Sequence, residues 1–184
     1  RQVICSSFGL VHAQQTNDLS VLHVQSKGKY NRIFNPNTNL KKLINQGGNN
    51  KATVEFWGMH NTHSSSSTAP LHWYVTNFKT GDKTFSIHIK EDQISFQLGT
   101  KTFKRDLFLG DQLFKNVWNH YAITVDTATK ELHAYINGIE ILFTKPDNFN
   151  VGDVYFVSDS KTDLFLAEYR AWSAKKSKEQ IKLE

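Results

Sequence analysis

WNHYAITVDTATKELHAYINGIEI, residues 118–141, contains two alternating segments joined by a polar turn, then an Asn-Gly pair and a third apolar run. Apolar residues stand at every second position of the two segments: Tyr121, Ile123, Val125, Leu132, Ala134 and Ile136. This period of two predicts antiparallel strands with one buried face and one polar face. Asn137-Gly138 supplies the positive φ angles of a type I′ hairpin turn, so Ile139 and Ile141 should return beside Ile136.

Outside this stretch, the same kind of pattern predicts further strands on both sides. They are expected at residues 19–24, 52–60, 71–78, 85–89, 94–98, 101–109, 151–157 and 164–172, with 85–89 and 94–98 forming a second hairpin. The first residues, to about Asn17, should be irregular or form an edge strand. One helical turn is expected at Leu40–Ile44. A short helix should follow Ser177, because its spacing to Gln180 is that of a capping box.

Three motifs in this order resemble the concanavalin A-like lectin/glucanase superfamily, in particular its laminin G-like domains. They are ATVEFW at 52–57, WNHYAITVD with LHAYING at 118–138, and AEYRAW with SKEQI at 167–181. The resemblance implies an all-β, two-sheet antiparallel jelly-roll sandwich with a short C-terminal helix. It implies one domain over residues 1–184, with a core of about 19–173 and a helical tail at 174–184. It also implies a glycan or protein ligand and an extracellular or cell-surface location.

Composition narrows the function classes. The hydrophobic content of 39% is that of a globular protein, and no apolar run is long enough to span a membrane. The net charge is +5, but the basic residues are scattered, which argues against a nucleic-acid interface. The chain begins with Arg1, so we expect a piece of a larger protein with neighbouring domains. The single cysteine, Cys5, and the absence of an N-glycosylation sequon weaken the extracellular assignment.

The sequence does not predict catalysis. Glycosidases of this fold need two carboxylates on alternate residues of one strand, and the chain has no E-x-D-x-E segment. Glu131 and Glu140 stand singly, and Glu91-Asp92 lies at a turn. We therefore expect a non-catalytic recognition module that needs no cofactor. A structural or assembly domain inside a multiprotein complex is the chief alternative, and a glycosidase-like enzyme is the third.

The candidate ligand residues come from the polar face of the predicted strands. If the apolar residues form the core, the solvent face carries amide, hydroxyl and imidazole groups suited to a glycan or peptide. The same groups would appear on any half-exposed antiparallel sheet. These residues are Ser86, His88, Ser95, Gln97, His120, Thr124, His133 and Tyr135. Trp73 could stack on a sugar or anchor a partner, although packing is the favoured explanation. Trp57, Trp118 and Trp172 are expected to pack in the core or at a sheet edge.

One loop could supply oxygen ligands to calcium. Asp159 and Asp163 enclose two hydroxyl residues just before the last predicted strand. Laminin G-like domains often hold calcium at a rim of the sandwich, which the resemblance extends to this loop. However, Lys161 lies inside the cluster, and Ala167 stands where the family frequently has an aspartate. We therefore expect an ordinary polar turn, with calcium as the alternative.

Overall fold

The computed structural model describes residues 12–16, 19–25, 32–34, 40–60, 69–76, 84–90, 93–98, 101–106, 117–145, 151–158 and 163–182. It describes side chains at positions 21, 23, 40–59, 117–145 and 165–181. The described chain is mainly β-strand, with two short helices. These are α1 (Leu40–Gly47) and α2 (Lys178–Lys182). Neither helix is long and apolar enough to cross a membrane, a finding that covers the described residues alone.

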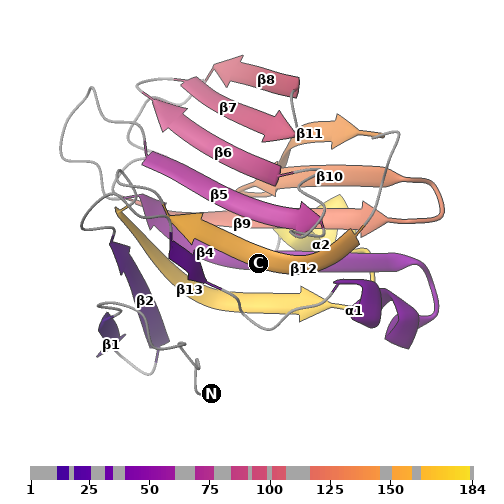
Figure 1. The fold of residues 1–184 in the computed structure, drawn as a ribbon, viewed down its shortest axis with the longest axis horizontal. Helices are drawn as coiled ribbons and strands as arrows, with labels where there is room; N and C mark the ends of the chain where they lie inside the picture. Colours follow the sequence, from indigo (N-terminus) through magenta and orange to yellow (C-terminus); the bar gives the residue numbers. More distant parts are fainter. Residues whose placement is uncertain are drawn as a thin grey trace.

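The strands form two antiparallel sheets (Figure 1). The seven-stranded sheet has the order β1–β2–β13–β4–β9–β10–β11. Its strands are β1 (His12–Thr16), β2 (Leu19–Gln25), β13 (Asp163–Trp172), β4 (Lys51–His60), β9 (Trp118–Asp126), β10 (Glu131–Ile136) and β11 (Ile139–Thr144). The six-stranded sheet has the order β3–β12–β5–β6–β7–β8. Its strands are β3 (Arg32–Phe34), β12 (Val151–Ser158), β5 (Ala69–Thr76), β6 (Thr84–Lys90), β7 (Gln93–Leu98) and β8 (Lys101–Asp106).

The two sheets lie face to face, with the six-stranded sheet in front in Figure 1. Helix α1 touches β12 of one sheet and β4 of the other, and its Leu40 and Ile44 are buried there. The predicted all-β jelly-roll sandwich is thus confirmed, as is the hairpin of β6 and β7, in which Ile87 lies opposite Phe96. Strand bounds moved by a few residues, with β5 two residues earlier than expected and β8 three residues shorter.

The described part of the core lies on the inner face of the seven-stranded sheet. On β4, Phe56 lies opposite Tyr121 of β9, and their rings stack with centroids 5.3 Å apart. Gly58 belongs to the same face, because a Cβ there would lie only 3.2 Å from the Tyr121 ring. Burying each large apolar side chain contributes about 1.5–3 kcal/mol. The buried apolar residues on β4, β9 and β10 that continue this face are Ala52, Val54, Ile123, Val125, Leu132, Ala134 and Ile136.

The hairpin after β10 has the predicted turn and one irregularity. Asn137 and Gly138 have φ angles of 50° and 74°, as a type I′ turn requires. Ile136 lies opposite Ile139, as expected, but the register then shifts so that Ala134 faces Leu142. Ile141 is therefore the extra residue of a β-bulge, and its predicted place beside the core strand was wrong. The bulge lets Leu142 become the buried residue of β11.

Strand β9 differs from the expectation of one buried and one polar face. Every residue of β9 after Trp118 is buried, including those on the outer face. Part of the cause is the segment 173–182, called here the C-terminal strap, which crosses the sheet on the side away from the six-stranded sheet (Figure 1). Ile181 of the strap is buried with Ala122 and Tyr135. The sandwich core covers one face of β9, and the strap covers part of the other.

Hydrogen bonds fix the beginning of the strap to β4 and start its helix. The Thr53 hydroxyl donates to the carbonyl of Ala174 at 2.7 Å and accepts from the Lys176 amide at 2.9 Å. Ser177 and Gln180 exchange two hydrogen bonds at the start of α2, which confirms the predicted capping box. The helix is shorter than the expected tail, because residues 173–177 are not helical.

Candidate ligand-binding face

Three of the residues predicted to face solvent are buried. His120 is 2% exposed, Tyr135 is 5% exposed and Thr124 is fully buried. The expectation of exposure was wrong because the outer face of β9 and β10 is covered. The imidazole of His120 lies against Trp57, with ring centroids 5.3 Å apart. Burial under the strap, followed by the charge of Glu140, raises the pKa of Tyr135 above its ordinary value.

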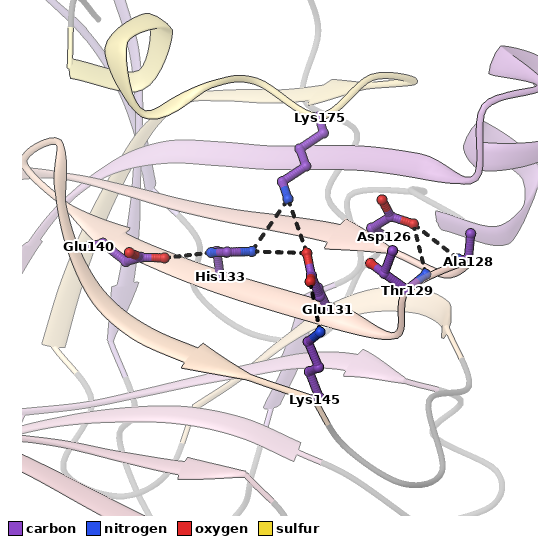
Figure 2. Close-up of polar contacts among 8 residues, drawn as sticks. All are labelled: Asp126, Ala128, Thr129, Glu131, His133, Glu140, Lys145 and Lys175. Carbon is purple, nitrogen blue, oxygen red and sulfur yellow. Dashed lines mark hydrogen bonds and ion pairs between the residues drawn. The ribbon is translucent and has the colours of Figure 1, made fainter.

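His133 lies in a line of charged groups on the outer face of β10 and β11 (Figure 2). Its Nδ1 is 2.5 Å from Glu140 Oε1, and its Nε2 is 3.5 Å from Glu131 Oε2. Lys175 reaches over from the strap to within 3.3 Å of the same Nε2. His133 stays near the surface, as predicted, but its ring nitrogens are engaged within the protein. A ligand would have to compete with these carboxylates for the imidazole.

Glu131 is the centre of this line. Lys145 lies 3.1 Å from one of its oxygens and Lys175 lies 3.5 Å from the other. The hydrogen bond from Lys145, with smaller contributions from His133 and Lys175, lowers the pKa of Glu131 to about 2. A carboxyl group with such a low pKa stays ionised at neutral pH and accepts hydrogen bonds. It is unsuited to donate a proton to a glycosidic oxygen.

A second carboxylate lies deeper, beneath the strap. Glu55 on β4 is 0% exposed, and its Oε1 lies 3.1 Å from Arg170 Nε and 3.2 Å from Lys176 Nζ. Its Oε2 has no hydrogen-bond partner among the residues that the structure describes. A fully buried carboxylate needs paired charges to offset its lost hydration. Glu55 therefore depends on one cation from β13 and one from the strap.

The remaining candidates lie where side chains are not described. Trp73 pairs with Phe85 and Phe156, and His88 pairs with Pro70 and Ser95, inside the six-stranded sheet. Asp163 begins β13 opposite Gln25, whereas Asp159 lies outside the described residues. Within the described part, no three His, Cys, Asp or Glu side chains form a group that could hold a metal ion. The calcium alternative for Asp159 and Asp163 stays a prediction.

The sequence did not predict an aromatic surface that the register assembles on the same outer face. Four strands contribute one row, in which Phe165 lies opposite both His23 and Met59, and Met59 lies opposite Trp118. The His23 and Phe165 rings stack with centroids 4.2 Å apart. Together with Trp57 on β4, these residues are called here the aromatic strip. All are partly exposed, and Trp118, at 40% exposed, lies outside the core.

Trp172 also lies outside the core. Its ring is 39% exposed, and the Lys176 ammonium lies 4.3 Å above it in a cation–π contact. Of the two expected positions, core or sheet edge, the exposure of Trp172 excludes the core. Pairing opposite Thr53 places Trp172 at the strap end of the face, separate from the aromatic strip. The sequence could not predict this exposure, because a tryptophan in an alternating strand is compatible with either the buried or the solvent face.

Comparison with solved structures places the fold among toxin binding domains. The receptor-binding domain of botulinum neurotoxin type G aligns at 12% identity over 94% of this chain and 43% of its own, with a TM-score of 0.61. The binding domain of botulinum neurotoxin DC in complex with rat synaptotagmin II aligns at 14% identity over 95% of this chain and 44% of its own, with a TM-score of 0.62.

A third structure concerns botulinum neurotoxin type C, whose cell entry is described as dependent upon interaction with two ganglioside molecules. It aligns at 14% identity over 95% of this chain and 44% of its own, with a TM-score of 0.65. This chain thus spans less than half the length of these solved chains. No curated protein matches the sequence. A family model described as the concanavalin A-like lectin/glucanases superfamily matches residues 29–182.

Proposed function

Because this chain belongs to the concanavalin A-like lectin/glucanases superfamily, we propose that it is a non-catalytic recognition module for a glycan or protein ligand. The observation that carries the proposal is the aromatic strip, whose partly exposed rings and Met59 extend across four strands. Rigid aromatic side chains on a sheet can stack on sugar rings or serve as anchors in a protein interface. Trp118 is the most exposed described member and the first residue to test.

The described carboxylates support a role other than hydrolysis. Glycoside hydrolysis needs one carboxyl group that holds a proton near neutral pH and a second carboxylate across the scissile bond. Glu131 has a lowered pKa, and Glu55 is buried against Arg170 and Lys176. Both groups are engaged with cations of the same chain. Their arrangement suits a structural role and supports recognition rather than a glycosidase-like activity.

The solved neighbours support the same class of function. One is held in complex with synaptotagmin II, and another is described by its dependence on ganglioside molecules. Binding of a protein or of a glycan is therefore compatible with this fold. Because the chain covers less than half of those structures, we also propose that it acts beside neighbouring domains of a longer protein. The chief alternative is a structural domain that uses the strip for permanent assembly.

The test uses the full chain and a matched pair of variants. Wild-type protein is screened on a glycan array and by affinity capture from native extract, and each identified ligand is then titrated. We expect Trp118→Ala to weaken binding about tenfold or more, as loss of a hot-spot aromatic does. Trp172→Ala removes an equally exposed tryptophan outside the strip and should leave the affinity unchanged. Circular dichroism of both variants confirms that they fold.

The outcomes separate the candidate functions. Dissociable binding that Trp118→Ala weakens supports recognition through the strip. Ligands that bind Trp118→Ala as tightly as wild type would show that the strip is not the contact surface. Capture only as a fixed component of a multiprotein complex would favour the assembly alternative. Hydrolysis of a β-glucan by the wild-type chain would contradict the non-catalytic assignment.

A further inference from the structure

The surface beneath the C-terminal strap has the features of a binding site for a basic segment. It is formed by Thr53 and Glu55 of β4, Ala122 of β9, and Glu131 and Tyr135 of β10, and is called here the acceptor face. It lies on the same side of the sheet as the aromatic strip but is made of different residues. The strap covers this face in the structure. Its residues therefore indicate which kind of segment the face can bind.

The strap and the acceptor face match at four points. Lys176 reaches the buried Glu55 carboxylate, and Lys175 reaches Glu131. Ile181 enters the apolar site between Ala122 and Tyr135. Thr53 binds the strap through backbone groups alone, which any extended segment could offer. The acceptor face thus contacts the lysines of the strap, its aliphatic residue and its backbone at separate places.

Charge complementarity defines the occupant. The face carries carboxylates in a chain whose net charge is +5, and the strap brings basic residues to them. Glu55 Oε2 is buried and has no hydrogen-bond partner among the described residues, so the site could accept one more donor. An acidic or neutral segment would leave Glu55 facing only Arg170 and would lose the ion pair that Lys176 supplies.

The strap is built as a separable element. Helix α2 has five residues, too few to be stable without tertiary contacts. Among residues 173–181, Ile181 is the only buried one, and the others are exposed or half-buried. Segments with few buried apolar contacts open at a small fraction of the free energy of global unfolding. The strap can therefore leave while the sandwich core stays folded.

We propose that the strap is a displaceable cover and that the acceptor face binds a basic segment of a partner protein. The partner segment presents a lysine that pairs with Glu55 and an aliphatic residue five positions later, as Lys176 and Ile181 do. This inference goes beyond the recognition function proposed for the aromatic strip. It uses different residues and has a separate readout, so either proposal can fail alone.

The probe is a fluorescein-labelled peptide with the sequence of residues 173–184, SAKKSKEQIKLE. It is titrated into the full chain, with fluorescence anisotropy as the measurement. We expect saturable binding, and about tenfold tighter binding to the Lys176→Ala chain, whose own strap competes less well. Lys178→Ala is the matched control, because Lys178 is exposed on α2 and should leave the affinity at the wild-type value.

The reciprocal change lies in the peptide and cannot unfold the protein. A peptide carrying alanine at the position of Lys176 should lose at least tenfold in affinity for the unchanged chain. Glu55→Gln should weaken binding of the natural peptide, and Glu131→Gln provides a second variant at a less buried position. In hydrogen exchange, the amides of Lys176 and Ile181 should exchange at least tenfold faster than that of Ala122.

Three results would overturn the proposal. One is the absence of saturable peptide binding to the Lys176→Ala chain. Another is equal affinity for the natural and the alanine-substituted peptide, because the Glu55 pairing would then not be recognised. The third is exchange of the strap amides as slow as exchange in β9, which would make the strap a permanent part of the domain.

Discussion

At the scale of single residues, charge placement on the outer face explains much of what the sequence left open. The Glu131 carboxylate accepts hydrogen bonds from three side chains (Figure 2). Lys145 directly follows β11, Lys175 lies on the strap, and His133 lies on β10 with Glu131. The alternation of β10 predicted only that Glu131 and His133 share a face. Their cationic neighbours come from positions 14 and 44 residues further along the chain, and no local pattern connects them.

The lowered pKa of Glu131 predicts a pH dependence of stability. The carboxyl group has an ordinary pKa of 4.5 when unfolded and about 2 when folded. A group whose pKa falls on folding stabilises the protein above its unfolded pKa, and this contribution is lost as the pH falls toward the folded value. Wild type should therefore be more stable than Glu131→Gln at about pH 6, and the difference should shrink between about pH 4.5 and pH 2.

Urea unfolding of both proteins across this range measures the effect. Glu168→Gln is the control, because Glu168 is an exposed acid on β13 that lies 3.8 Å from Arg170. The difference in unfolding free energy between Glu168→Gln and wild type should change much less with pH. A Glu131→Gln difference that stays constant from about pH 6 to pH 2 would contradict the assigned ion pairs.

At the scale of elements, the strap buries part of the outer face of β9 and β10. Hairpin turns and strand pairing follow the sequence closely, because Asn137-Gly138 and the period-2 pattern act locally. The strap acts at long range, since Thr53 binds Ala174 across 121 positions of the chain. It converts Tyr135 from a predicted ligand contact into part of a buried cluster with Ala122 and Ile181.

Tyr135 therefore has a structural role that mutation can measure. Tyr135→Ala should lower the free energy of unfolding by about 3 kcal/mol, the cost of removing a buried aromatic ring. Tyr135→Phe keeps the ring and should cost much less. His133→Ala, at a position near the surface, should also cost less than Tyr135→Ala. Chemical denaturation of the three variants is the measurement, and wild-type stability of Tyr135→Ala would contradict the packing of the strap.

At the scale of the whole molecule, the two sheets lie face to face and α1 contacts both of them. The single domain expected over residues 1–184 stays a prediction, as does the calcium site at Asp159 and Asp163. The family match from residue 29 to 182 agrees with the order of the three motifs. The match and the sandwich confirm the architecture.

Thermal unfolding tests the calcium alternative on the intact chain. We expect a single transition whose Tm changes by less than about 1 °C when Ca²⁺ replaces EDTA, because a ligand stabilises only the state that binds it. Lys161 opposes a cation in the loop, and Ala167 adds no carboxylate. A rise of several degrees in wild type, absent from the Asp159→Asn and Asp163→Asn variants, would establish a calcium site instead.

The sequence by itself determined most of the strands, the Asn-Gly turn and where the last helix begins, whereas the short strand β3 was not predicted. Those features follow from alternation, Asn-Gly and capping-box spacing, which act within a few residues. Only the tertiary structure decided which face of each strand is covered. The strap buries Tyr135, His120 is buried beside Trp57, and the register leaves Trp118 exposed. Periodicity states which residues share a face, but the burial of that face depends on segments packed from far along the chain.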